Sequence, residues 1–214
     1  MSRDEVKAVF NRIMGEFLFP LLESRGYRAK GKDRYVLVEG DNEYHVGVRL
    51  HHPPRSDLAA IFVSASVAFR RLWQFLKPCS VFARANLYSV TGCGGLIINM
   101  FPRDLAPSWS LFDANSSPEA LGQEMVGQFQ KYVFPYVEHF SHLDNALTYW
   151  AGGGPFDRMA RAAALLLRGQ RDQAFKELDE RIAEAEQEYQ ETLKPGHAER
   201  VAEFRRFRAF LATA

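Results

Sequence analysis

A sharp change of hydrophobic period at Gly26 constrains the fold of this chain more than any other feature. From about Ser2 to Arg25, the apolar residues recur with the spacing of an amphipathic helix. After Gly26, apolar and polar residues alternate, most clearly over 43–50, which is typical of strands with one buried face. The chain therefore begins with one long helix that is followed by a series of strands.

Turn residues divide the alternating region into short strands. We expect strands at 27–29, 34–39, 43–50, 58–69, 87–91, 96–100 and 109–112, with the glycine-rich residues 92–95 as a turn. We expect a short helix at 71–76 and a second long helix at 118–140, which starts at Ser117-Pro118. Short loops favour a mainly antiparallel sheet of about five to seven strands, with helices 2–25 and 118–140 packed on one face. The predicted fold class is α+β.

Both long helices contain a Phe-Pro pair in a similar setting. Residues 17–23 (FLFPLLE) are matched in form by residues 132–138 (YVFPYVE). Proline lacks the backbone donor and crowds an earlier carbonyl, so we expect a kink at Pro20. Two amphipathic helices that kink alike against one sheet would explain the match, and an internal duplication is the alternative.

The glycine run before Pro155 is the expected hinge between two domains. Beyond it, the chain is rich in Ala, Leu, Glu, Arg and Gln, which is typical of helices. We expect helices at 162–168 and 171–190 and a last helix that ends near Leu211; residues 169–174 resemble the turn of a tetratricopeptide-type hairpin. The predicted domains are an α+β core at 1–150 and a helical hairpin extension at 155–214.

Composition limits the class of protein. With 47% hydrophobic residues the chain can bury a core, and its net charge of +1 lacks the basic surplus of a nucleic-acid-binding protein. Its two cysteines, Cys79 and Cys93, do not form a disulfide framework, and a cysteine nucleophile is a minor alternative. The chain has no apolar run of about 18 residues, and Asp4 and Glu5 stand where a signal peptide would be apolar. We expect a cytoplasmic protein that contacts neither membrane nor nucleic acid.

Motifs that carry chemistry are sparse. His45 and His51 share a face of the expected strand but lie about 20 Å apart, too far to share a metal ion. His139 and His142 have the spacing of a helical pair, but no further ligand stands at a known spacing. Residues 91–95 lack the end of a P-loop and the glycine spacing of a dinucleotide-binding motif. We therefore predict no catalytic residue, no bound metal and no cofactor.

Two charged segments are the candidate binding sites. A basic strip around the first hairpin, together with the polar side of the strand that follows, gives Arg28, Lys30, Lys32, Arg34, His45, Arg49 and His51. The helix expected at 171–190 gives the acidic residues Glu180, Glu184 and Glu188. Each segment has a structural alternative. The basic strip could be a solvated edge that prevents strand pairing between molecules, and the acids could pair with arginines of the next helix.

The N-terminal part also resembles a known family. The residues that carry the resemblance are Phe10, Ile13, Pro20-Leu21-Leu22, Gly26-Tyr27 and Gly31, followed by strands that end in Val46-Gly47-Val48. This pattern is similar to a bacterial family of uncharacterised proteins (domain of unknown function 4304 type) and covers about residues 5–140. The resemblance implies a bacterial, cytoplasmic α+β protein and supplies no catalytic residues.

These observations favour a non-catalytic protein-binding module, of immunity or adaptor type, whose partner is another protein. The alternative is a small hydrolase or nucleic-acid-processing enzyme that uses His45, Arg49 and His51. An enzyme should bring a histidine and a polar partner together in a pocket. A binding protein should instead expose an aromatic or charged patch.

Overall fold

The computed structural model describes residues 3–54, 56–96 and 107–214. The chain divides into two compact units. Unit 1 contains the chain up to Val67 together with Gly94–Ser141, and unit 2 contains Ala68–Cys93 and His142–Ala214. The sequence placed a domain boundary between 150 and 155. The units of the structure instead join 68–93 and 142–151 to the C-terminal helices.

Five strands of the described chain form one antiparallel sheet in chain order. They are β1 (Arg28–Ala29), β2 (Arg34–Glu39), β3 (Asn42–His51), β4 (Ala60–Phe69) and β5 (Gly92–Leu96). Tyr44, Val46 and Val48 of β3 lie in the core, on the side that the alternation predicts. The other side is only partly exposed, because Glu43 and His45 are buried while Arg49 and His51 are exposed. Together with the helices, this antiparallel sheet confirms the predicted α+β fold class.

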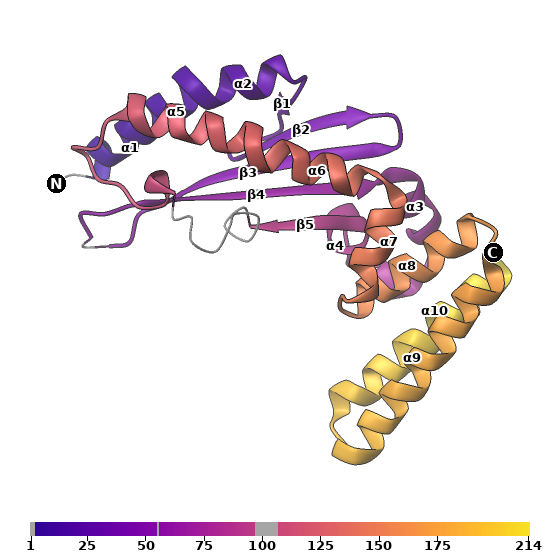
Figure 1. The fold of residues 1–214 in the computed structure, drawn as a ribbon. Coiled ribbons are helices and arrows are strands. Elements are labelled where there is room, and N and C mark those ends of the chain that lie inside the picture. Colours follow the sequence, from indigo (N-terminus) through magenta and orange to yellow (C-terminus); the bar gives the residue numbers. More distant parts are fainter. Residues whose placement is uncertain (1–2, 55, 97–106) are drawn as a thin grey trace. The chain divides into compact units, whose positions relative to one another are not determined.

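Two long helices cover one face of the sheet in unit 1 (Figure 1). The first contains α1 (Arg3–Arg12) and α2 (Phe19–Ser24), and the second contains α5 (Pro118–Gln128) and α6 (Phe134–Ser141). The two run in the same direction: Arg12 forms an ion pair with Glu119, and the Arg25 guanidinium lies 4.7 Å from the centre of the Phe134 ring. Their apolar sides and the inward faces of β3 and β4 form the core.

Each long helix widens into a π-helical segment immediately before its Phe-Pro pair. Ile13–Leu18 is π-helical before Phe19-Pro20, and Phe129–Val133 is π-helical before Phe134-Pro135. A π-helical turn lengthens the hydrogen-bond ladder by one residue, which makes room for a proline that cannot donate. The helix distortion expected at Pro20 takes this form, and the second helix repeats it.

The chain after β4 differs from the prediction. The helix expected at 71–76 is present as α3 (Arg70–Leu76), but residues 87–91, predicted as a strand, form helix α4 (Leu87–Thr91). The glycine-rich residues predicted as a turn lie in β5. Gly94 has φ of +157°, and a Cβ there would lie 2.2 Å from the Ala65 carbonyl oxygen. Gly94 therefore allows a close approach to β4, and the sequence pattern alone does not distinguish such a glycine from one in a turn.

The strand predicted at 109–112 is also wrong. Ser108–Ser110 forms a 3₁₀ turn, and Phe112 makes an isolated antiparallel bridge with Ala59. The other predicted strand of this region, at 96–100, lies outside the described residues beyond Leu96.

Unit 2 is helical apart from the strand ends that it contains. Besides α3 and α4, its helices are α7 (Leu143–Ala151), α8 (Pro155–Leu167), α9 (Arg171–Thr192) and α10 (Pro195–Thr213). The predicted C-terminal helical hairpin is confirmed as α9 and α10 (Figure 1). Gly169, with φ of +77°, closes α8 in the left-handed conformation that a helix end favours. None of the described helices has both the length and the apolar composition that crossing a bilayer requires.

Candidate binding face of the sheet

The sheet face opposite the long helices carries most of the predicted basic residues. Residues paired across antiparallel strands share a face, so Arg28, Val36 and His45 form one row and Arg34 and Gly47 form the next. The alternation along β3 and β4 adds residues to the same side. We call this surface the polar face; it comprises Arg28, Arg34, His45, Gly47, Arg49, His51, Phe62 and Ser64.

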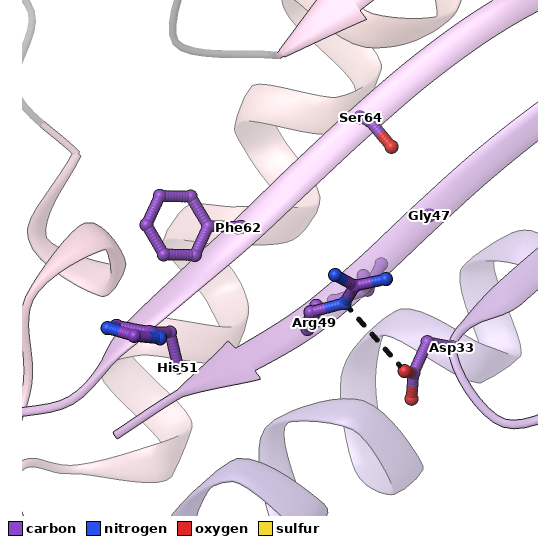
Figure 2. Close-up of a pocket in the computed structure, with 7 residues that line it drawn as sticks. Asp33, Gly47, Arg49, His51, Phe62 and Ser64 are labelled. Atoms are coloured by element: carbon purple, nitrogen blue, oxygen red, sulfur yellow. Dashed lines mark ion pairs between the residues drawn. The ribbon is translucent and has the colours of Figure 1, made fainter. Parts of the chain in front are cut away.

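A hollow of about 400 Å³ lies on the polar face along β3 and β4 (Figure 2). It is lined by Asp33, Gly47, Val48, Arg49, His51, Phe62 and Ser64. Gly47 leaves its floor bare, since a Cβ at this position would lie 2.7 Å from the Ser64 hydroxyl oxygen. A side chain in place of this glycine would therefore take up part of the hollow.

Arg49 is held loosely at the rim of the hollow. Its Nε lies 4.0 Å from Asp33 Oδ2, and the two side chains are 77% and 48% exposed (Figure 2). An ion pair of this length and exposure contributes little to stability. A guanidinium group can bind a carboxylate through two parallel hydrogen bonds. Arg49 is thus available to an acidic ligand, whose carboxylate would take the place of Asp33.

Two rings form the other side of the hollow (Figure 2). The centres of the His51 and Phe62 rings are 5.7 Å apart in an edge-to-face arrangement, and Phe62 is 47% exposed. Phe62 was not among the predicted site residues. A signal for it was present, because its neighbours Ile61 and Val63 belong to the buried face, which places a large apolar side chain on the polar one. Asp33 and Ser64 have no comparable signal.

His45 does not line the hollow. Its side chain is buried, with Nε2 3.3 Å from Glu43 Oε1, and Lys30 Nζ lies 3.5 Å from the same oxygen. Burial lowers the pKa of His45 to about 4, against the opposing effect of Glu43. The imidazole is therefore neutral at pH 7. Of the predicted histidines and arginine on β3, the structure brings together Arg49 and His51 but separates His45 from them by burial.

The other predicted cations lie around the hollow rather than in it. Arg34 is opposite Gly47, Arg28 is one row farther away, and Lys32 is in the turn before β2. All three are exposed at the surface. Two carboxylates pair with cations here, Glu43 with Lys30 and Asp33 with Arg49.

Covalent and metal-dependent chemistry find little support in the described part of the chain. Neither the Ser64 hydroxyl group nor the His51 ring has a hydrogen-bond partner among the described residues, so the hollow holds no nucleophile–base pair there. Cys79 and Cys93 are free and buried, and burial raises the pKa of both thiols, the opposite of what a nucleophile requires. Within the same described ranges, no group of three or more His, Cys, Asp and Glu side chains could hold a metal ion.

The predicted acidic residues lie on α9 and are paired within unit 2. The pairs are Lys176–Glu180 at 3.9 Å, Arg181–Glu184, and Arg200–Glu188 at 3.0 Å. Arg205 and Arg208 of α10 reach back to Glu186 and Asp179 of α9. The structural alternative, in which the two helices complement each other in charge, thus describes this surface.

The chain matches no protein-family model, and no curated protein or solved structure is detectably similar to it. Its resemblance to an uncharacterised bacterial family therefore stays a prediction.

Proposed function

We propose that this protein is a non-catalytic binding protein whose polar face binds an acidic segment of another protein. The observation that carries the proposal is Arg49, an exposed guanidinium group at 4.0 Å from its carboxylate partner, on the rim of a hollow that also offers the Phe62 ring. A carboxylate of the partner can displace Asp33 from Arg49, and an apolar group can pack on Phe62. Both are typical contacts of protein interfaces.

The composition of the polar face favours a protein partner over a nucleic acid. A protein that binds single-stranded nucleic acid uses several aromatic rings along a continuous cationic groove. The hollow instead offers one exposed phenylalanine, and the chain as a whole has a net charge of +1. A short acidic segment requires fewer cations, because local charge complementarity is sufficient to orient it.

We further propose that the protein acts in the bacterial cytoplasm, as an immunity or adaptor component. Free, buried cysteines suit a reducing compartment. The described residues that line the hollow include no nucleophile–base pair, which suits a protein that binds rather than catalyses.

Capture from a bacterial lysate tests this proposal. The immobilised full chain is compared with the double variant Arg49→Glu/Phe62→Ser and with Lys176→Glu, a charge reversal on the surface of unit 2 that serves as the matched control. We expect an acidic protein to be retained by the natural chain and the control, to be lost with the double variant, and to elute in about 0.5 M salt. Retention that the double variant does not change, or retention of nucleic acid in place of protein, contradicts the proposal.

A further inference from the structure

A groove lies on the other side of Arg49, between α1 and the end of β3 in unit 1. Its volume is about 650 Å³, within the range of pockets that bind ligands. It shares Asp33, Val48 and Arg49 with the hollow of Figure 2. The two spaces therefore meet at the Arg49–Asp33 ion pair. We call this space the α1 groove.

The floor of the α1 groove is apolar. It is formed by Phe10, Met14, Phe19, Tyr35 and Val48, all buried or half-buried. The Phe19 and Tyr35 rings have centres 5.2 Å apart, and burial raises the pKa of Tyr35 to about 12, so its hydroxyl group is uncharged. Such a floor favours an apolar side chain and disfavours a charged one.

The rim of the α1 groove is cationic. Arg3, Lys7 and Lys32 form no ion pair with any described residue, and Arg49 is held at 4.0 Å by Asp33. The acids of the rim are Asp4 and Asp33, so the cations are in excess. A ligand that complements this groove carries an apolar group with acidic groups beside it.

The groove also contains an edge of β3. The Val48 N–H donates to the Asp33 carbonyl at 2.9 Å, and β2 begins at Arg34, opposite Gly47. Leu50 is two residues beyond Val48, so its backbone amide and carbonyl point to the same edge of β3 as those of Val48. At Leu50 this edge lies beyond the first residue of β2. An extended peptide can pair with a strand edge at such a place. The geometry is that of a peptide site rather than of a site for a compact small molecule.

We infer that the α1 groove binds the apolar side chains of the partner segment whose acidic residues bind Arg49. The inference rests on the proposed function and names its partner class, an extended peptide with bulky apolar residues flanked by acidic ones. The apolar residues pack on Phe10 and Phe19, and the flanking carboxylates face Lys7, Lys32 and Arg49. The peptide backbone pairs beside Leu50.

Fluorescence anisotropy with two labelled peptides tests the inference. The first peptide has a Phe-Leu pair flanked on both sides by Glu and Asp, and the second has Ala-Ala in place of Phe-Leu at the same charge. The variant Asn11→Trp fills the α1 groove from an exposed position of α1, and Asn11→Ala is its matched control. Lys7→Glu, also at an exposed position, tests the rim without adding bulk.

The natural chain and Asn11→Ala should bind the Phe-Leu peptide at least about ten-fold more tightly than the Ala-Ala peptide, because apolar area is buried with one peptide only. Asn11→Trp should remove this difference, Lys7→Glu should lower the affinity for the Phe-Leu peptide, and the backbone amide of Leu50 should gain protection from hydrogen exchange when that peptide binds. The natural chain and the Asn11 and Lys7 variants could instead bind both peptides with equal affinity, while Arg49→Glu alone lowers that affinity. The inference is then wrong and the proposed function stands. If neither peptide binds the natural chain, both are overturned.

Discussion

Unit 1 and unit 2 both contain runs of like charge, but the structure treats the two runs differently. In unit 2, the acids of α9 lie beside the arginines of α10, with Arg200–Glu188 at 3.0 Å and Arg205–Glu186 at 2.6 Å. In unit 1, Lys30 lies 3.5 Å from Glu43 and Arg49 lies 4.0 Å from Asp33, while Lys32 has no ion pair among the described residues. Two helices of opposite charge bring partners together along their length, whereas the hairpin places Arg28 and Arg34 opposite the uncharged residues Val36 and Gly47. A charge run in a sequence therefore indicates a binding surface only where the fold does not supply its counter-charge.

The largest expected effect concerns Arg161 of unit 2. Its guanidinium donates to both oxygens of Glu177, at 2.7 and 2.9 Å, and to the Leu147 carbonyl, with 16% of the Arg161 side chain exposed. Arg161→Ala leaves a partly buried carboxylate and a carbonyl without this donor, so we expect the free energy of unfolding to fall by about 3 kcal/mol. Urea denaturation measures the change.

Arg49→Ala is the counterpart in unit 1. Because its ion pair is long and exposed, we expect the free energy of unfolding to change by less than about 0.5 kcal/mol. If Arg161→Ala and Arg49→Ala lowered the free energy of unfolding by the same amount, the contrast between a paired and an available arginine would be wrong.

As the pH falls, we expect the protein to lose stability from a group in unit 1 at a higher pH than from a group in unit 2. The pKa of His45 is about 4 in the folded chain and near 6.5 in the unfolded chain, so the unfolded chain binds more protons between these values. The stability contributed by neutral His45 is complete above pH 6.5 and is lost as the pH falls toward 4. We expect a loss of about 2 kcal/mol between pH 7 and pH 5.

The variant His45→Gln checks this assignment, since it should flatten the dependence between pH 7 and pH 5 in urea denaturation. In unit 2, Arg208 lowers the pKa of Asp179, whose contribution is lost only as the pH falls below the ordinary range of an aspartate. An unchanged pH dependence in His45→Gln would assign the effect to another group.

The smallest effect is expected from a single surface pair of the hairpin. Arg200 and Glu188 are 40% and 51% exposed, and the His197 ring also lies 3.8 Å from Glu188. A double-mutant cycle of Arg200→Ala and Glu188→Ala should give a coupling of about 0.5 kcal/mol. A coupling above about 2 kcal/mol would mean that this pair, rather than apolar packing, holds α9 to α10.

The fold was predictable from the sequence wherever one period continues over many residues. The long helices and α9 each repeat one pattern over two turns or more, and burial follows that pattern. On β3 only the core-facing side follows its pattern, since Glu43 and His45 of the other side are buried as well. The prediction failed over 87–95, because the elements there are short and a glycine fits either a turn or a close approach between strands. Gly94 permits contact with Ala65 of the neighbouring strand, and nothing in the local pattern distinguishes this from a turn.

For the candidate site, the sequence identified Arg49 and His51 as residues of one strand face, because alternation fixes the side on which each residue lies. It grouped His45 with them, although burial beside Glu43 sets that histidine apart. Burial depends on what covers a residue, which periodicity does not contain.

The sequence by itself determined the two long helices, the C-terminal hairpin, the main strands with their core-facing sides, and the two charge runs, since all of these depend on neighbours along the chain. Only the tertiary structure decided which charges are paired, where Gly47 and Ser64 leave a hollow, and that Phe10 and Val48 share the floor of a groove. The physical reason is distance along the chain. A cavity or an ion pair between elements depends on the packing of segments that lie far apart in the sequence, and local propensity does not encode that packing.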